Sequence, residues 1–453
     1  MVHSKRPGIG DAVESSNLGA DVHQSQEVPV ISPVHRDDLP FTPPASDRME
    51  EKRRVEQLRA EVRQAKYGSI NEILDAAEEL EHPELKEIFI AEALLVYSRE
   101  NFEEAADFLL KDARRSPELL QRFVDSWDRE TFDAPESEPA YALEGFREFV
   151  RSNPGKASSF LGVLPSGGIK TVASFETVEI WYGRDPAAAI DWVVSLPEAS
   201  EQDESTSFAM MALGEQWGGN EGIAAIDWVM NRPDPVKWEP FISGAITSLS
   251  GQDYTLVTDW FATVDNESLR RSLAPQVAEI TATKSLSDAV AILNACKDRE
   301  LRQDVLLAMA FASIEVRPQE TMEWLGTLES DEVSKNAITH ASAAWADVSR
   351  NDIERWLKGN PNYTGRDYAI SGMLTADSSM NYPSSVMWSM EIEDAQLRKE
   401  MIQNTVKVWR EDRGIDTADK EMVAFLDILS QRVSPQASGE VRDAVLALDL
   451  PEE

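Results

Sequence analysis

Carboxylates are the most frequent side chains in this chain that could do chemistry, and two groups of them stand out. Asp253 and Asp259 form one group, and Glu391, Glu393 and Asp394 form the other. Two carboxylates held in different environments can act as general acid and general base, as in glycoside hydrolysis. Both groups nevertheless fall at expected helix starts and loops, where acids are common because they cap backbone amides. We therefore expect no catalytic residue among them.

Histidine and cysteine, the other common catalytic and metal-binding residues, are scarce. Only His82 and His340 lie beyond the first 47 residues, and Cys296 is the single cysteine. None of them has a neighbour at the spacing of a metal site or a thiol catalyst, and a lone cysteine excludes an internal disulfide. The sequence also lacks a glycine-rich phosphate loop. We expect no metal and no cofactor, and we expect Cys296 to pack in an apolar helix.

A large excess of acidic residues restricts the partners. The sequence has 81 Asp and Glu against 44 Lys and Arg, a formal net charge of -37. Such a field repels nucleic-acid phosphates and favours cationic partners at low salt. We expect no nucleic-acid binding. The interpretation we favour is that the acids keep a large repeat protein soluble, and the alternative is that they attract a basic protein partner.

The distribution of apolar residues bears on membranes and on the compartment. The sequence contains no run of 18 apolar residues and no signal-peptide core in its first thirty residues. We therefore expect no membrane span. As written, the chain is expected to be cytoplasmic, or periplasmic or in the cell envelope if an amino-terminal signal or anchor has been removed. The sequence leaves the oligomeric state open.

Aromatic residues recur at a regular interval over the carboxyl-terminal two thirds of the chain. The recurring positions, which we call the anchors, are Phe160, Trp192, Trp228, Trp260, Leu293, Trp324, Trp356 and Trp388. Successive spacings are 32, 36, 32, 33, 31, 32 and 32 residues, and the hexapeptide at 188–193 recurs unchanged at 224–229. A period in the thirties indicates stacked helical hairpins, each of which needs its neighbours to bury its apolar face.

The local sequence around an anchor predicts the ends of a helix. Asp185 and Pro186 indicate a capped start, Trp192 follows on the apolar face, and Leu196 before proline indicates the end. The second helix of each hairpin is predicted at 207–216, 239–249, 269–281, 301–314, 333–345, 366–374 and 397–409.

Five of the second helices carry a basic residue near their start, at Arg270 or Arg271, Arg302, Lys335, Arg366 and Arg398. The hairpin anchored by Trp192 has the acids Asp203 and Glu204 there instead. Since a positive charge opposes the helix dipole there, we expect a compensating carboxylate from an adjacent repeat.

The anchors allow two interpretations. Exposed aromatic faces could line a groove for sugar or for a cationic ligand. Recurrence at one place in every hairpin instead favours packing between helices, which is the interpretation we adopt. Trp238 lies outside the register and is the candidate for an exposed contact.

Residues 181–197 contain a recurring phrase: Trp, three residues, Asp-Pro, a run of small residues, Trp and then Leu-Pro. This phrase resembles bacterial helical-repeat proteins abundant in Verrucomicrobia and Planctomycetes. The resemblance covers roughly 150–430 and implies a tetratricopeptide-like architecture, without implying a catalytic residue.

We predict an all-α, right-handed α-solenoid with repeats of about 32–36 residues. Residues 1–47 are predicted to form a disordered tail, 48–150 a helical cap region and 151–450 the solenoid, with a long loop at 126–139. A non-enzymatic, protein-binding or scaffolding role fits best. The alternatives are an α/α-toroid enzyme, a hydrolase or lyase that uses clustered carboxylates, and an array that binds copies of itself.

Overall fold

The computed structural model describes residues 45–80, 82–112, 117–133, 140–200, 203–376, 381–414, 420–425, 439 and 441–443. The chain divides into two units, residues 1–57 and 58–453. Of the first unit, only the opening part of helix α1 (Ala45–Gln64) is described. The predicted tail therefore lies outside the described residues, except that 45–47 are helical.

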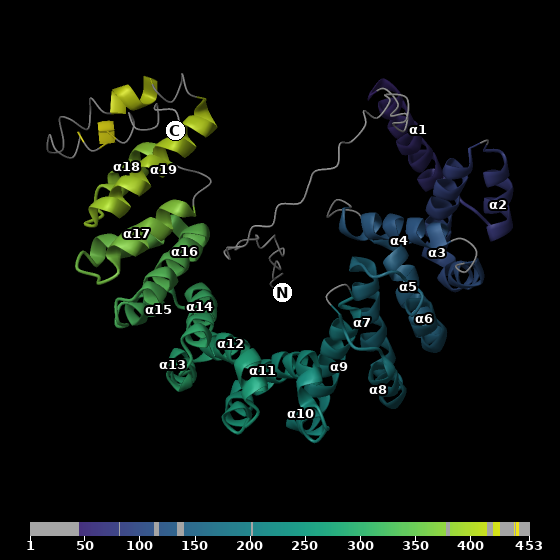
Figure 1. Ribbon diagram of the computed structural model, residues 1–453, viewed down its shortest axis with the longest axis horizontal. Coiled ribbons are helices and arrows are strands. Elements are labelled where there is room, and N and C mark those ends of the chain that lie inside the picture. Colours follow the sequence, from purple (N-terminus) through teal and green to yellow (C-terminus); the bar gives the residue numbers. More distant parts are fainter. Residues whose placement is uncertain are drawn as a thin grey trace, which may run out of the picture. The chain divides into compact units, whose positions relative to one another are not determined.

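The second unit is all-helical over the residues described, which confirms the predicted class (Figure 1). Its helices after α1 are α2 (Ile70–Glu78), α3 (Pro83–Asp112), α4 (Pro117–Phe132), α5 (Tyr141–Ser152), α6 (Pro154–Leu161), α7 (Gly168–Tyr182), α8 (Pro186–Ser195), α9 (Ser205–Glu221), α10 (Ile223–Met230), α11 (Glu239–Ala262), α12 (Glu267–Lys284), α13 (Leu286–Ala295), α14 (Arg299–Val316), α15 (Pro318–Leu325), α16 (Glu332–Gly359), α17 (Arg366–Thr375), α18 (Tyr382–Ser389) and α19 (Ala395–Arg413). A short 3-10 helix, Pro235–Trp238, precedes α11.

Short side chains define where the helices begin. Asp185 accepts a hydrogen bond from the Ala188 amide at 3.1 Å, as the Asp-Pro pattern predicts. Asp298 caps α14 in the same way through the Leu301 amide at 2.9 Å. At 349 and at Asp253 the backbone leaves helical geometry inside α16 and α11, so each of these elements joins the second helix of one hairpin to the first helix of the next.

Each helix packs mainly against helices that are close to it in the sequence. Helices α7, α9, α11, α12, α14, α16 and α17 contact one another in chain order, whereas α8, α10, α13 and α15 each pack between two of them (Figure 1). At the junction of α9 and α11 the backbones approach closely. A Cβ on Gly214 would lie 2.0 Å from the Phe241 carbonyl oxygen, and one on Gly244 would lie 2.1 Å from that of Met211. Glycine at these two positions permits the contact.

Three apolar clusters form the core. The first contains residues between Val62 and Ala173, the second between Val178 and Met401, and the third between Tyr382 and Val441. The first cluster includes the anchor Phe160, whose ring lies 5.8 Å from that of Phe102. The core therefore continues past 150, where the sequence had placed a division.

The predicted loop at 126–139 is wrong over its first part. Helix α4 extends to Phe132, and Ser126 and Trp127 on it are buried. The Trp127 ring lies 5.0 Å from that of Phe102. Of the acids that suggested a loop, Asp133 is exposed, whereas Glu130 is partly buried and pairs with Arg99 at 2.8 Å; 134–139 lie outside the described residues.

Candidate docking groove

The carboxylates first considered for acid–base chemistry have structural partners. Asp253 accepts hydrogen bonds from the amide and hydroxyl of Thr255 at 2.9 and 2.7 Å. Asp394 caps α19 through the amides of Gln396 and Leu397, both at 2.9 Å. Glu391 forms an ion pair with Arg366, which joins adjacent repeats. Asp259, from the first group, lines a cavity.

The two histidines in the described ranges lie on different elements, His82 before α3 and His340 in α16. His82 and His340 are both exposed, and the His340 ring lies 5.8 Å from that of Phe311. Within the described ranges, no three His, Cys, Asp or Glu side chains are grouped so that they could hold a metal ion. Among the helices described, none has the length and apolar character needed to traverse a bilayer.

The anchors face the core. Phe160 and Leu293 are at most 1 % exposed, Trp260, Trp356 and Trp388 are buried, and the remaining three are partly buried against the second cluster. In three repeats a second tryptophan, eleven residues earlier, contacts the anchor. These pairs are Trp181–Trp192, Trp217–Trp228 and Trp345–Trp356, with ring centroids 5.9, 4.8 and 5.7 Å apart.

The prediction that Trp238 is an exposed contact is wrong. The side chain is only 7 % exposed, and its ring lies 5.3 Å from that of Trp228 and 6.0 Å from that of Phe241. Trp238 ends the 3-10 helix Pro235–Trp238 between α10 and α11, and this helix places its ring on the aromatic cluster.

The basic residues at the second-helix starts mostly bind backbone carbonyls. Arg302 donates to the Leu293 carbonyl at 2.9 Å, and Arg366 donates to that of Leu357 at 2.6 Å. These carbonyls lie near the carboxyl end of the preceding helix, where the dipole favours a positive charge. Arg271 also has the predicted type of partner, since it pairs with Asp298 and Glu300 of the next repeat at 3.3 Å. The prediction therefore omitted the carbonyl partners.

A cavity of about 720 Å³ lies beside the one anchor that is not aromatic. Its walls are the second segment of α11 (254–262) and α13, and residues of α12 and α14 complete it. We call this cavity the groove. Its apolar lining comprises Phe261, Ala274, Ala291, Ile292, Ala295 and Leu301. Phe261, Ala274 and Leu301 are buried and form the base, whereas Ala291 and Ala295 are exposed along α13.

Charged side chains surround the apolar base of the groove. They are Asp259, Glu267, Arg270, Asp288, Lys297 and Asp298, and all four acids are exposed. The Arg270 guanidinium is already bound to the Val264 carbonyl. Because Asp298 is already paired with Arg271, the other three carboxylates against two cations leave an excess of one negative charge. The rim therefore favours a cationic occupant.

One end of the groove is closed by a contact between its walls. The Tyr254 hydroxyl donates to a carboxylate oxygen of Asp288 at 3.2 Å, which joins the amino-terminal ends of the two wall segments. Helix α13 has 10 residues, so the groove runs for roughly 15 Å. Two to three turns of a helix fit this length.

Cys296 lines the groove at the end of α13. Its thiol donates to the Ile292 carbonyl at 3.3 Å, and burial raises the pKa of the thiol. The half-buried side chain adds apolar surface to the lining of the groove. The predicted packing role is thus met only in part, because Cys296 is half-buried and borders the groove.

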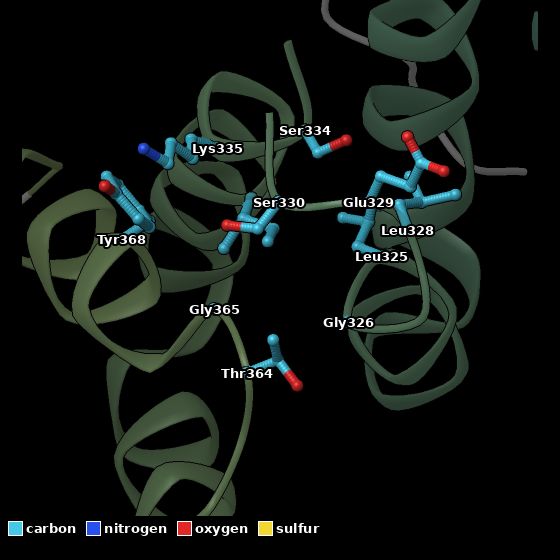
Figure 2. A pocket seen from close by; sticks show the side chains of 11 residues that line it. Leu325, Gly326, Leu328, Glu329, Ser330, Ser334, Lys335, Thr364, Gly365 and Tyr368 are labelled. Carbon is cyan, nitrogen blue, oxygen red and sulfur yellow. The ribbon is translucent and has the colours of Figure 1, made fainter. Parts of the chain in front are cut away.

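In the repeats around Trp324 and Trp356, a cavity of only about 10 Å³ lies between the end of α15, the first turns of α16 and the start of α17 (Figure 2). Tyr363 occupies the space there. Its hydroxyl donates to the Met322 carbonyl at 2.8 Å, its ring lies 4.9 Å from that of Trp356, and burial raises its pKa. Lys335 and Tyr368 lie together on one side of this cavity (Figure 2). Tyr363 thus fills space beside α15, whereas no aromatic side chain of the described residues fills the groove beside α13.

Comparisons with protein-family models, with curated proteins and with solved structures found no match for this chain. The groove was missed from sequence, although a signal for it exists. At Leu293 the repeat has leucine where six of the other seven repeats have tryptophan at the anchor, and Ala282 stands where three repeats have the second tryptophan.

Proposed function

We propose that this protein is a non-enzymatic, protein-binding scaffold whose groove receives a basic, amphipathic helical segment. The observation that carries the proposal is the groove itself, with an apolar base, a rim of excess negative charge and the length of a short helix. Helical segments dock in such grooves through apolar side chains spaced three and four residues apart. Lysine or arginine on the flanks of the same helix would meet the acids of the rim.

The packing of the helices supports a solenoid as the framework. The extensive contacts within the described residues join helices no more than three elements apart along the chain. This pattern is expected for a right-handed stack of hairpins with a repeat of about 32–36 residues, in which each repeat touches only its neighbours. The resemblance of the repeat phrase to bacterial helical-repeat proteins points in the same direction.

The roles of the candidate acids favour binding over catalysis. Asp253 and Asp394 are helix caps, and Glu391 is paired with an arginine. An acid–base pair needs one group with a free proton position toward a substrate, and these groups are already engaged. The toroid enzyme is therefore not our proposal.

A fluorescein-labelled model peptide tests the proposal. The peptide has leucines on one helical face and lysines on its flanks, and its binding to the full chain is followed by fluorescence anisotropy. We expect saturable binding that weakens as salt is raised. A peptide with serine in place of leucine tests the apolar base, and one with glutamate in place of lysine tests the rim.

Each control separates one contribution. Binding that survives the serine replacement would reduce the interaction to charge attraction and contradict docking in the groove. Binding that survives the glutamate replacement would contradict the role of the acidic rim. If neither the leucine–lysine peptide nor its controls bind, the proposed function is wrong.

A further inference from the structure

Arg232 has an unusual environment in a chain with a net charge of -37. Its guanidinium carbon lies 3.9 Å from the ring centroid of Trp228 and 4.5 Å from that of Trp238. The two rings stand at 87° to each other, with centroids 5.3 Å apart, and so form a corner around the cation. Both contacts are cation–π interactions, which attract the charge without neutralising it.

No carboxylate neutralises this arginine within the part of the chain that the structure describes. The Arg232 Nε is buried and has no hydrogen-bond partner there. Desolvation alone lowers the pKa of the guanidinium. The nearby Lys237 is paired with Glu198, so that carboxylate is engaged elsewhere. The cation is therefore partly dehydrated and lacks the counter-ion that usually compensates for this cost.

The geometry also fixes the position of the cation. Arg232 is followed by Pro233, Asp234 and Pro235, and each proline restricts its own φ angle. The aromatic rings hold the side chain from two sides. A guanidinium presents its N–H groups in a planar fork that matches a carboxylate in two parallel hydrogen bonds. A fork held in place loses less conformational entropy when it binds.

We propose that Arg232, held in the corner of Trp228 and Trp238, is a receptor for a single carboxylate on a partner. A carboxylate suits the site better than phosphate because it carries the smaller negative charge against the field of this acidic chain. The site lies on the segment after α10, whereas the groove is walled by α11 and α13, so this inference does not depend on the proposed function.

Nuclear magnetic resonance of the full chain with 15N-labelled arginine tests the proposal. The Nε–H signal of Arg232, assigned with Arg232→Lys, is followed during titration with sodium acetate, with sodium chloride at equal ionic strength, and with inorganic phosphate. We expect a saturable shift with acetate that chloride does not reproduce. Arg184, an exposed arginine on the loop before α8, is the internal control and should not show it.

A variant tests the role of the corner. Trp238→Leu keeps the arginine and removes one ring, and we expect acetate to bind it about tenfold more weakly. Circular dichroism shows whether the Trp238→Leu variant is folded. If the variant is unfolded, the titration of the wild-type chain alone decides the proposal. A shift of Arg232 no larger than that of Arg184, or the same shift with chloride, overturns the proposal. Saturation with phosphate but not acetate overturns the choice of carboxylate.

Discussion

The repeats around Trp228 and around Leu293 share a helical plan but differ in how the space beside the anchor is filled. At Trp228 the rings of Trp217, Trp238 and Phe241 lie within 6.0 Å, and Arg232 covers the cluster. At Leu293 no aromatic anchor is present, and a cavity of about 720 Å³ borders the helix that carries it. One helical plan therefore holds a packed aromatic cluster at one anchor and borders an open cavity at another.

The largest expected effect comes from removing the centre of the packed repeat. Trp228→Ala deletes a ring that contacts three other aromatic rings, and we expect the free energy of unfolding to fall by about 3–5 kcal/mol. Urea unfolding followed by circular dichroism measures this change. A loss of less than about 1 kcal/mol would show that the aromatic cluster at Trp228 is not tightly packed, and would contradict the contrast with the repeat at Leu293.

The close contact between α9 and α11 supports the packed repeat and gives a second test. Gly244→Ala places a Cβ against the Met211 carbonyl, at 2.1 Å in the present backbone, so the two helices must separate. We expect a loss of about 1–3 kcal/mol. Gly251→Ala is the matched control, since a Cβ there meets nothing within 4 Å. Equal stability of the two variants would contradict the close packing.

Alkylation of Cys296 tests the repeat that contains the groove. This prediction concerns a reaction rate, and we expect no change in the free energy of unfolding. Burial raises the thiol pKa above its ordinary value of 9.0, so less thiolate is present at any given pH. The rate of reaction with iodoacetamide should therefore rise with pH through a midpoint above 9.0. Mass spectrometry follows the single cysteine. The leucine–lysine peptide should slow the reaction, and an unchanged rate with bound peptide would place the peptide elsewhere.

Much of the fold could be predicted from the sequence because each hairpin carries local signals. The second-helix segments predicted from 207 to 409 all lie inside helices, and Asp185 caps α8 as expected. The loop predicted at 126 failed because charge was taken as a sign of a loop. The apolar side of that helix, with Phe123 and Trp127, gave the better signal.

The candidate site could not be predicted in the same way. A cavity depends on side chains from several helices that meet only in the folded chain, and Asp259, Glu267 and Lys297 have no distinctive spacing. The exposed position predicted for Trp238 failed for a related reason. A residue outside the repeat register can still fold back onto the core, as the 3-10 helix before α11 shows.

Filling the groove is the most direct test of the central claim. Ala291 lines the groove on α13, and Ala187 is an exposed alanine on α8, outside it. Ala291→Trp should weaken binding of the leucine–lysine peptide by about tenfold or more, while Ala187→Trp should leave it unchanged and both variants keep the wild-type unfolding curve. Equal binding by the two variants would contradict the account.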